Sequence, residues 1–104
     1  MGGTSFVAFL TSDDRIRHRH FSIKGRVREF TIQYEAFIFG KWHPVIRYDT
    51  AHGFAHLDRM HPDGSVEKVP LLYWDYNEAL TFAQYDIKSN WEWYRKRYKK
   101  EMGE

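Results

Sequence analysis

The sequence contains no cysteine, so disulfide bonds, thiolate nucleophiles and thiolate metal sites are all excluded. It also has no apolar run near the roughly 20 residues that a membrane-spanning helix needs. Its first apolar run, Phe6–Leu10, is short and follows no basic residue, unlike the core of a signal peptide. These absences predict a cytoplasmic protein without a membrane partner.

A strong excess of either charge is missing as well, because 16 Lys and Arg residues oppose 14 Asp and Glu residues. A formal net charge of +2 does not by itself indicate a nucleic-acid-binding protein. The glycine-rich motifs of nucleotide-binding proteins and the motif of serine hydrolases are absent too. At 104 residues, we expect a single domain covering residues 1–104.

Aromatic residues, in contrast, are abundant, with eight Phe, seven Tyr and four Trp making up 18% of the chain. A domain of this size has little interior for so many large rings. Some of them should be half-exposed or covered by a partner subunit. We therefore expect a homodimer.

Alternation of apolar and polar residues predicts strands between about residues 5 and 72. Gly40-Lys41 reads as a two-residue hairpin loop, Thr50–Gly53 as a four-residue turn and His61–Gly64 as a type I turn. A capping box of Asp75 and Glu78 then begins a helix of about residues 75–101. The expected fold is α+β: an antiparallel meander of four to six strands with one long C-terminal helix packed across one face.

The faces of the sheet follow from these two loop lengths, because strand side chains alternate between faces. One face is expected to pack on the helix and to carry Phe37, Phe39, Trp42, Ile46, Tyr48, Ala55 and Leu57. The other is expected to carry Tyr34, His43, Arg47, Asp49, His56 and Asp58.

Acid–base chemistry is one interpretation of that polar face, since histidine transfers protons near neutral pH. His56 and His52 would transfer protons, Asp49 would orient a base, and Arg47 would hold a phosphate. The full set of candidate catalytic residues is Tyr34, Arg47, Asp49, His52, His56 and Asp58. The alternative is a solvated face of weak cross-strand ion pairs.

Metal binding is a further alternative for the same residues. His52 and His56 have the spacing of a helical zinc pair, but in an extended segment they would lie about 13 Å apart. A composite site of Asp49, His56 and Asp58 is conceivable. We nevertheless predict no metal and no cofactor, and a phosphodiester cleavage that is metal-independent.

The end of the predicted helix is basic, with Trp93 and Tyr98 interleaved. Such a segment can contact nucleic acid through charge and stacking. Cations also belong at a helix C-terminus, where the helix dipole is negative. The candidate nucleic-acid-binding residues here are Arg95, Lys96, Arg97, Lys99 and Lys100.

The stretch "VIRYDTAHGFAH" resembles a segment of TumE-type toxins of prokaryotic toxin–antitoxin pairs, through Arg47, Tyr48, Asp49, His52 and His56. It also resembles uncharacterised small prokaryotic proteins with an RYDTAHG-type segment. The toxin resemblance implies a short sheet with a C-terminal helix, ribonuclease-like action on RNA and a small antitoxin-like protein partner. The alternative hypothesis is a non-catalytic dimeric module that binds a protein or nucleic acid through its aromatic surfaces.

Overall fold

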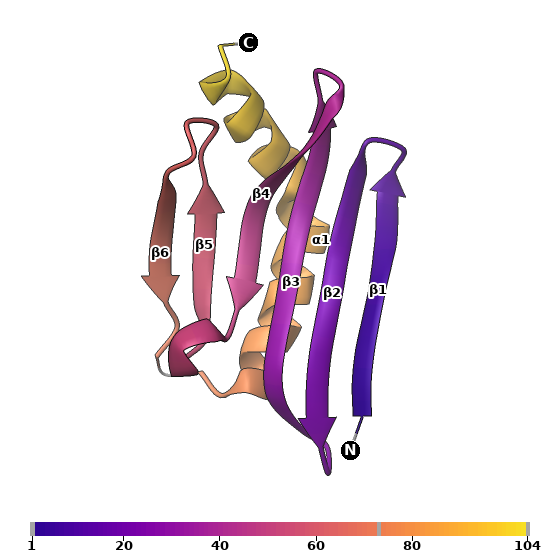
Figure 1. Ribbon diagram of the computed structural model, residues 1–104, viewed down its shortest axis with the longest axis vertical. Helices are drawn as coiled ribbons and strands as arrows, with labels where there is room; N and C mark the ends of the chain where they lie inside the picture. Colours follow the sequence, from indigo (N-terminus) through magenta and orange to yellow (C-terminus); the bar gives the residue numbers. More distant parts are fainter. Residues whose placement is uncertain (1, 73, 104) are drawn as a thin grey trace.

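The computed structural model describes residues 2–72 and 74–103 as one antiparallel sheet and one long helix (Figure 1). Strand order follows chain order, from β1 at one edge to β6 at the other. The elements are β1 (Gly2–Thr11), β2 (Asp14–Ile23), β3 (Arg26–Ile38), β4 (Lys41–Asp49), the short 3₁₀ turn η1 (Ala51–Gly53), β5 (His56–Met60), β6 (Val66–Pro70) and α1 (Tyr76–Glu101). The predicted α+β two-layer meander is confirmed.

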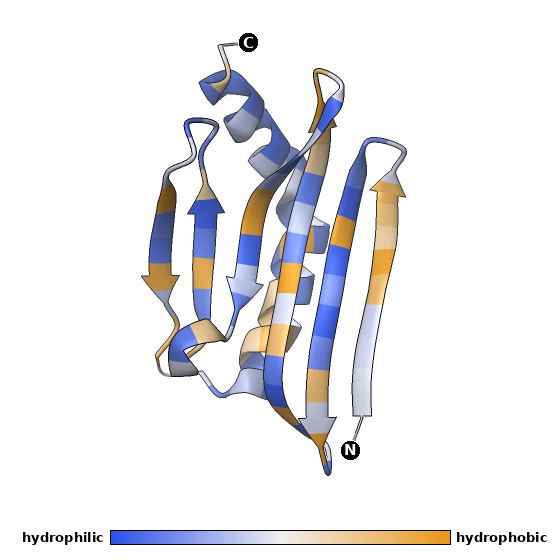
Figure 2. Cartoon of the chain, viewed as in Figure 1, coloured by the Kyte–Doolittle hydropathy of each residue, from blue (hydrophilic) through white to orange (hydrophobic). Residues whose placement is uncertain are grey.

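Helix α1 begins where the sequence predicts, with Asp75 and Glu78 forming the capping box. Its buried side packs mainly on β3 and β4 and consists of Ala79, Leu80, Ala83, Asp86, Ile87, Tyr94 and Tyr98. Apolar and polar residues alternate along β3, which marks its two faces (Figure 2). Across the described part of the chain, no helix combines the length and apolar character needed to cross a membrane.

The β3–β4 hairpin corrects the predicted faces of the sheet. Its two-residue loop is Phe39-Gly40, with φ values of 51° and 76°, rather than Gly40-Lys41. Paired positive φ angles match the twist of the flanking strands, as in a type I′ turn. This displacement of the loop by one residue would, by itself, leave each side chain on its predicted face of the sheet. However, the register shifts between Tyr34 and Glu35, which leaves Val45 as an extra residue on β4 and changes the face of every pair beyond it.

Because of the bulge, several residues lie on the face of the sheet opposite to the one that the sequence predicts. Tyr34 pairs with Ile46 rather than Arg47, and its fully buried side chain belongs to the core under α1. His43 also turns to the helix, where its ring lies 5.5 Å from that of Tyr98. Conversely, Trp42 stacks with Arg15 on the face opposite the helix, with the guanidinium carbon 3.8 Å from the ring centroid. Phe37 accompanies Trp42 there, with the ring centroids 5.2 Å apart.

Two buried carboxylates connect α1 to the sheet. Asp86 accepts hydrogen bonds from the hydroxyls of Tyr48 (2.7 Å) and Tyr94 (2.6 Å). Asp14 accepts from the hydroxyl of Tyr34 (2.6 Å) and from Arg95 Nη1 (2.8 Å). Because a buried charge is tolerated only when it is well paired, these contacts fix where the helix sits on the sheet.

His61, in the turn between β5 and β6, should make the stability of the fold depend on pH. His61 Nδ1 lies 2.5 Å from Glu101 and its Nε2 lies 2.6 Å from Glu67. Hydrogen bonds to Glu101 and then Glu67 raise the pKa of His61 above its ordinary 6.5. The imidazolium therefore stabilises the fold below pH 6.5, and this contribution is lost as pH rises through the raised pKa.

We expect His61→Gln to lower the free energy of unfolding at pH 6, by less than about 1 kcal/mol for such an exposed pair. At pH 9 the variant and the parent should be equally stable. Urea denaturation at both pH values measures the difference. The hydrogen bond from His61 also holds the pKa of Glu101 below its ordinary 4.5, so the contribution persists to about pH 4.5 and fades only in stronger acid. A deficit of equal size at pH 6 and pH 9 would contradict this origin.

Candidate functional site

Helix α1 covers one face of the sheet, and within residues 2–72 and 74–103 no element covers the other, which we call the open face (Figure 1). Two neighbouring rows of paired residues cross this face. The first row is Val7, Arg17, Gln33, Arg47, Asp58 and Lys68. The second row is Ser5, Arg19, Thr31, Asp49, His56 and Pro70. Since the rows are two residues apart along each strand, they are separated by about 6.7 Å.

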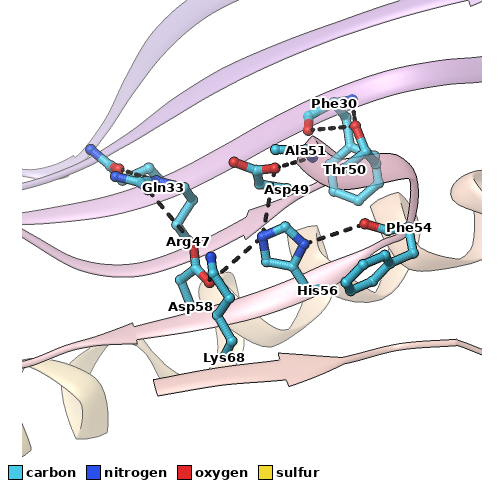
Figure 3. A network of polar contacts seen from close by, with 10 residues as sticks. All are labelled: Phe30, Gln33, Arg47, Asp49, Thr50, Ala51, Phe54, His56, Asp58 and Lys68. Atoms are coloured by element: carbon cyan, nitrogen blue, oxygen red, sulfur yellow. Dashed lines mark hydrogen bonds and ion pairs between the residues drawn. The ribbon is translucent and has the colours of Figure 1, made fainter. Parts of the chain in front are cut away.

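The two rows bring together Asp49, His56 and Asp58, which we call the histidine–aspartate cluster (Figure 3). His56 Nε2 lies 3.6 Å from Asp58 Oδ1 and 3.8 Å from Asp49 Oδ1. The side chains of His56 and Asp58 are only 1% and 2% exposed, whereas that of Asp49 is 17% exposed. One ligand atom from each residue lies within 4.8 Å of the others, so these three side chains could hold a metal ion.

Two cations neutralise the buried carboxylate of Asp58. Lys68 Nζ donates to Asp58 Oδ1 at 3.0 Å, and Arg47 Nη1 lies 3.6 Å from Asp58 Oδ2. Arg47 also donates from Nε to Gln33 at 2.9 Å, which holds its guanidinium over the open face. Arg47 thus links the cluster to Gln33 on β3.

Asp49 supports the turn that carries His52. The backbone N–H of Ala51 donates to Asp49 Oδ1 (Figure 3). His52 follows with a φ of 73°, in the left-handed region, and is exposed. Its ring centroid lies 6.3 Å from that of His56. His52 therefore stands at the rim of the cluster.

The other half of the open face is built around Glu35. Its buried carboxylate accepts hydrogen bonds from Arg15 (2.6 Å) and Arg17 (3.0 Å) and from Gln33 (2.6 Å). Although burial opposes ionisation, these three donors hold the pKa of Glu35 below its usual range. Fixing the arginine stems in this way leaves Arg17, at 52% exposed, available to solvent.

A shallow hollow of about 310 Å³ lies beside these arginines. Its lining combines apolar and polar groups, including Val7, Arg17, Arg19, Thr31 and Gln33. It adjoins the first row at Gln33, which bonds Arg47. The hollow and the cluster are therefore two parts of one surface.

The structure brings together most, but not all, of the candidate catalytic residues predicted from the sequence. The structure brings Arg47, Asp49, His56 and Asp58 together and places His52 at their rim, whereas Tyr34 lies on the opposite side of the sheet. The observed pairs are Arg47 with Asp58 and Asp49 with His56, because the β4–β5 loop is two residues longer than the predicted four-residue turn. A change of two residues leaves the faces unaltered.

The predicted basic residues at the end of α1 lie in the other layer. Arg95 bonds Asp14 and the carbonyls of Asp13 and Phe37, and Arg97 bonds Glu101 and the Met60 carbonyl. Lys96 and Lys100 are exposed, and Lys99 is half-buried. The two arginines thus have structural partners, and an interaction of this segment with nucleic acid stays a prediction.

Three members of the site were missed in the sequence: Arg17, Gln33 and Lys68. Sequence signals existed for two of them, Lys68 and Arg17. The His61–Gly64 turn places Val66 opposite Met60, and the same antiparallel register places Lys68 opposite Asp58. Arg17 lies midway between Arg15 and Arg19, so an extended β2 puts all three on one face.

Comparison with known proteins adds one match. The family model described as "Domain of unknown function (DUF7718)" matches residues 1–104. Neither the curated proteins nor the solved structures contain a match to this chain. Over its whole length, the chain therefore belongs to the DUF7718 family, a domain of unknown function.

Proposed function

We propose that this protein binds single-stranded RNA across the open face and cleaves it beside the histidine–aspartate cluster, as a toxin-like ribonuclease of the cytoplasm. The supporting observation is the first row, in which Arg17, Arg47 and Lys68 occupy every second strand. Neighbouring strands lie about 4.8 Å apart, so these cations recur about every 9.6 Å. A line of cations of this kind suits a phosphate backbone.

Aromatic rings at the edge of the same surface favour a single strand over a duplex. Phe9 is 60% exposed, and its ring lies 6.0 Å from that of Trp42, which in turn carries Arg15. Exposed rings and stacked guanidinium groups provide faces on which unpaired bases stack. Bases of a duplex are already stacked and would gain little from these side chains.

The proposed reaction is attack of a ribose 2′-oxygen on the adjacent phosphorus, with departure of the 5′-oxygen. Arg47 binds the phosphate, and His52 accepts the proton of the 2′-hydroxyl while water protonates the leaving oxygen. His56 is too deeply buried to meet a substrate, so no proton transfer is assigned to it. The products are a 2′,3′-cyclic phosphate and a 5′-hydroxyl end.

RNA binding can be assigned to one layer of the protein by matched double variants. We expect Arg17→Ala with Arg47→Ala to weaken binding of a fluorescent single-stranded RNA about tenfold and to reduce the salt dependence by about two counterions. Lys96→Ala with Lys100→Ala removes the same charge from α1 and should have little effect. Fluorescence anisotropy at several salt concentrations measures both. If only the helix pair weakens binding, the basic end of α1 is the RNA site and the open face is not.

Cleavage is tested with end-labelled RNA, whose products are identified by their termini. Cyclic phosphate ends are expected from the parent protein, and a loss of about 100-fold in rate or more is expected for His52→Ala. The His20→Gln variant, at a half-buried position on β2, controls for removal of a histidine remote from the cluster. An Arg47→Ala, His52→Ala double variant that still cleaves at the parent rate would overturn the proposed chemistry.

A non-catalytic dimeric module is the second candidate, because strand β1 has the features of a contact surface. Its ten residues, Gly2–Thr11, carry no charge, and Phe6, Val7 and Phe9 are 47%, 43% and 60% exposed. Uncharged edge strands pair readily with other chains. Pairing with a second copy or with a small antitoxin-like protein would cover β1. A strictly monomeric protein by light scattering, with no partner on co-expression with a neighbouring small open reading frame, would count against this candidate.

A further inference from the structure

We propose that the histidine–aspartate cluster binds one divalent transition-metal ion, Zn²⁺ or Mn²⁺, through His56 Nε2 and one carboxylate oxygen each of Asp49 and Asp58. This inference concerns the cluster alone and holds whether or not RNA is the substrate. It also departs from the expectation of metal-independent chemistry.

The distances between the ligand atoms fit a single ion. Ligands at 2.0–2.2 Å from a tetrahedral zinc ion lie about 3.4 Å apart. His56 Nε2 lies 3.6 and 3.8 Å from the nearer oxygens of Asp58 and Asp49, and all three ligand atoms lie within 4.8 Å of one another. The 3.6 and 3.8 Å separations are too long for hydrogen bonds. They would need to shorten only slightly to reach the separation of two ligands on one zinc ion.

The histidine is also oriented as a ligand. His56 Nδ1 lies 3.3 Å from the carbonyl oxygen of Phe54, to which it can donate (Figure 3). This contact fixes the tautomer that leaves a lone pair on Nε2, aimed between Asp49 and Asp58. Metal-binding histidines usually donate their second ring N–H to a carbonyl or carboxylate in this manner.

Neighbouring groups hold the two carboxylates in place. The Ala51 N–H donates to Asp49 Oδ1, the oxygen nearer His56, and Arg47 lies beside Asp58 Oδ2, the oxygen farther from His56. A buried histidine with two carboxylates combines nitrogen and oxygen ligands, which suits zinc or manganese better than magnesium. Asp49, at 17% exposed, is the most exposed of the three side chains and forms the solvent side of the cluster, where an ion or a water would enter.

Lys68 is the group with which an ion would compete. Its Nζ lies 3.0 Å from Asp58 Oδ1, the same oxygen that faces His56. At 52% exposed, this side chain can swing into solvent when a metal ion takes its place. The ammonium therefore acts as the counter-ion of the metal-free cluster, and its removal should strengthen metal binding.

Isothermal titration calorimetry of the untagged, chelator-treated full chain with ZnCl₂, MnCl₂ and MgCl₂ tests the proposal. We expect one high-affinity Zn²⁺ site per chain, a weaker Mn²⁺ site and little Mg²⁺ binding. Asp58→Asn and His56→Gln should each reduce Zn²⁺ affinity at least 100-fold. Lys68→Gln should increase it about threefold to tenfold, an effect that a merely structural role of the cluster would not produce.

Another histidine provides the matched control. His61 also lies between two carboxylates, but both of its ring nitrogens already contact them directly. His61→Gln should therefore leave Zn²⁺ binding unchanged. Should Asp58→Asn or His56→Gln fail to fold, as shown by circular dichroism, Asp49→Asn at the exposed rim is the deciding variant. Parent protein without a stoichiometric Zn²⁺ site, or folded cluster variants with parent affinity, would overturn the proposal.

Discussion

Replacing Arg95 with alanine is expected to lower the free energy of unfolding by about 3 kcal/mol, because it leaves the buried carboxylate of Asp14 without its cation. Asp14 is 5% exposed, and Arg95 Nη1 donates to it at 2.8 Å. The same guanidinium donates to the carbonyls of Asp13 (3.2 Å) and Phe37 (3.1 Å). One side chain of α1 thus ties together two hairpins of the sheet.

The neighbouring lysine is a matched control for Arg95. Lys96→Ala removes a cation one position along the helix from an exposed site, so its effect on unfolding should stay within about 0.5 kcal/mol. Arg95→Lys should be intermediate, since an ammonium cannot reproduce the forked contacts of a guanidinium. Urea denaturation of the three variants measures these differences. Equal effects of Arg95→Ala and Lys96→Ala would show that Arg95 is an ordinary surface cation.

A loss of similar size, about 3 kcal/mol, is expected for Asp86→Ala. This variant leaves the buried hydroxyls of Tyr48 and Tyr94 without the acceptor that they share. It also releases Asn90, which donates to Asp86 Oδ1 at 2.8 Å. Each buried hydroxyl without a partner costs about 1–3 kcal/mol.

Further variants separate the effect of losing the Asp86 hydrogen bonds from the effect of losing its side-chain volume. Asp86→Asn keeps the size and one acceptor oxygen, so it should recover part of the loss. Tyr48→Phe with Tyr94→Phe removes the two donors and should make a subsequent Asp86→Leu far less costly than Asp86→Leu alone. Thermal unfolding of this double-mutant cycle reports the coupling. Strict additivity would show that the hydroxyl contacts carry little of the stability.

Local patterns predicted the elements of this fold well because each has its own chemical signature. The capping box marked the start of α1, and the His61–Gly64 turn marked the β5–β6 hairpin. The β-bulge at Val45 had no such signature, since an extra residue in a strand alters no propensity. Its consequence was large, because it exchanged the faces of Tyr34 and Trp42 relative to Arg47.

The candidate site was predicted in part, and for a physical reason. Arg47 with Asp49, and His56 with Asp58, are two residues apart on single strands, so each pair shares a face whatever the register. The β4–β5 loop differs from its predicted length by an even number, which preserved their convergence. The burial of His56 could not be predicted from the sequence, because its 1% exposure depends on side chains from several strands. That burial turned an expected proton-transfer residue into a proposed metal ligand.

The order of the strands has a consequence for how the chain acquires its structure. Every strand pairs with the strand next to it in sequence, across turns of a few residues. Loop closure between such neighbours costs little entropy, so the sheet can grow hairpin by hairpin, in a protein with few distant pairings. The contacts that span the whole chain belong to α1, as in the bond from Arg95 to Asp14, 81 positions away. During synthesis, the helix leaves the ribosome after the sheet, so we expect the sheet to remain a loose ribbon until α1 docks and completes the core.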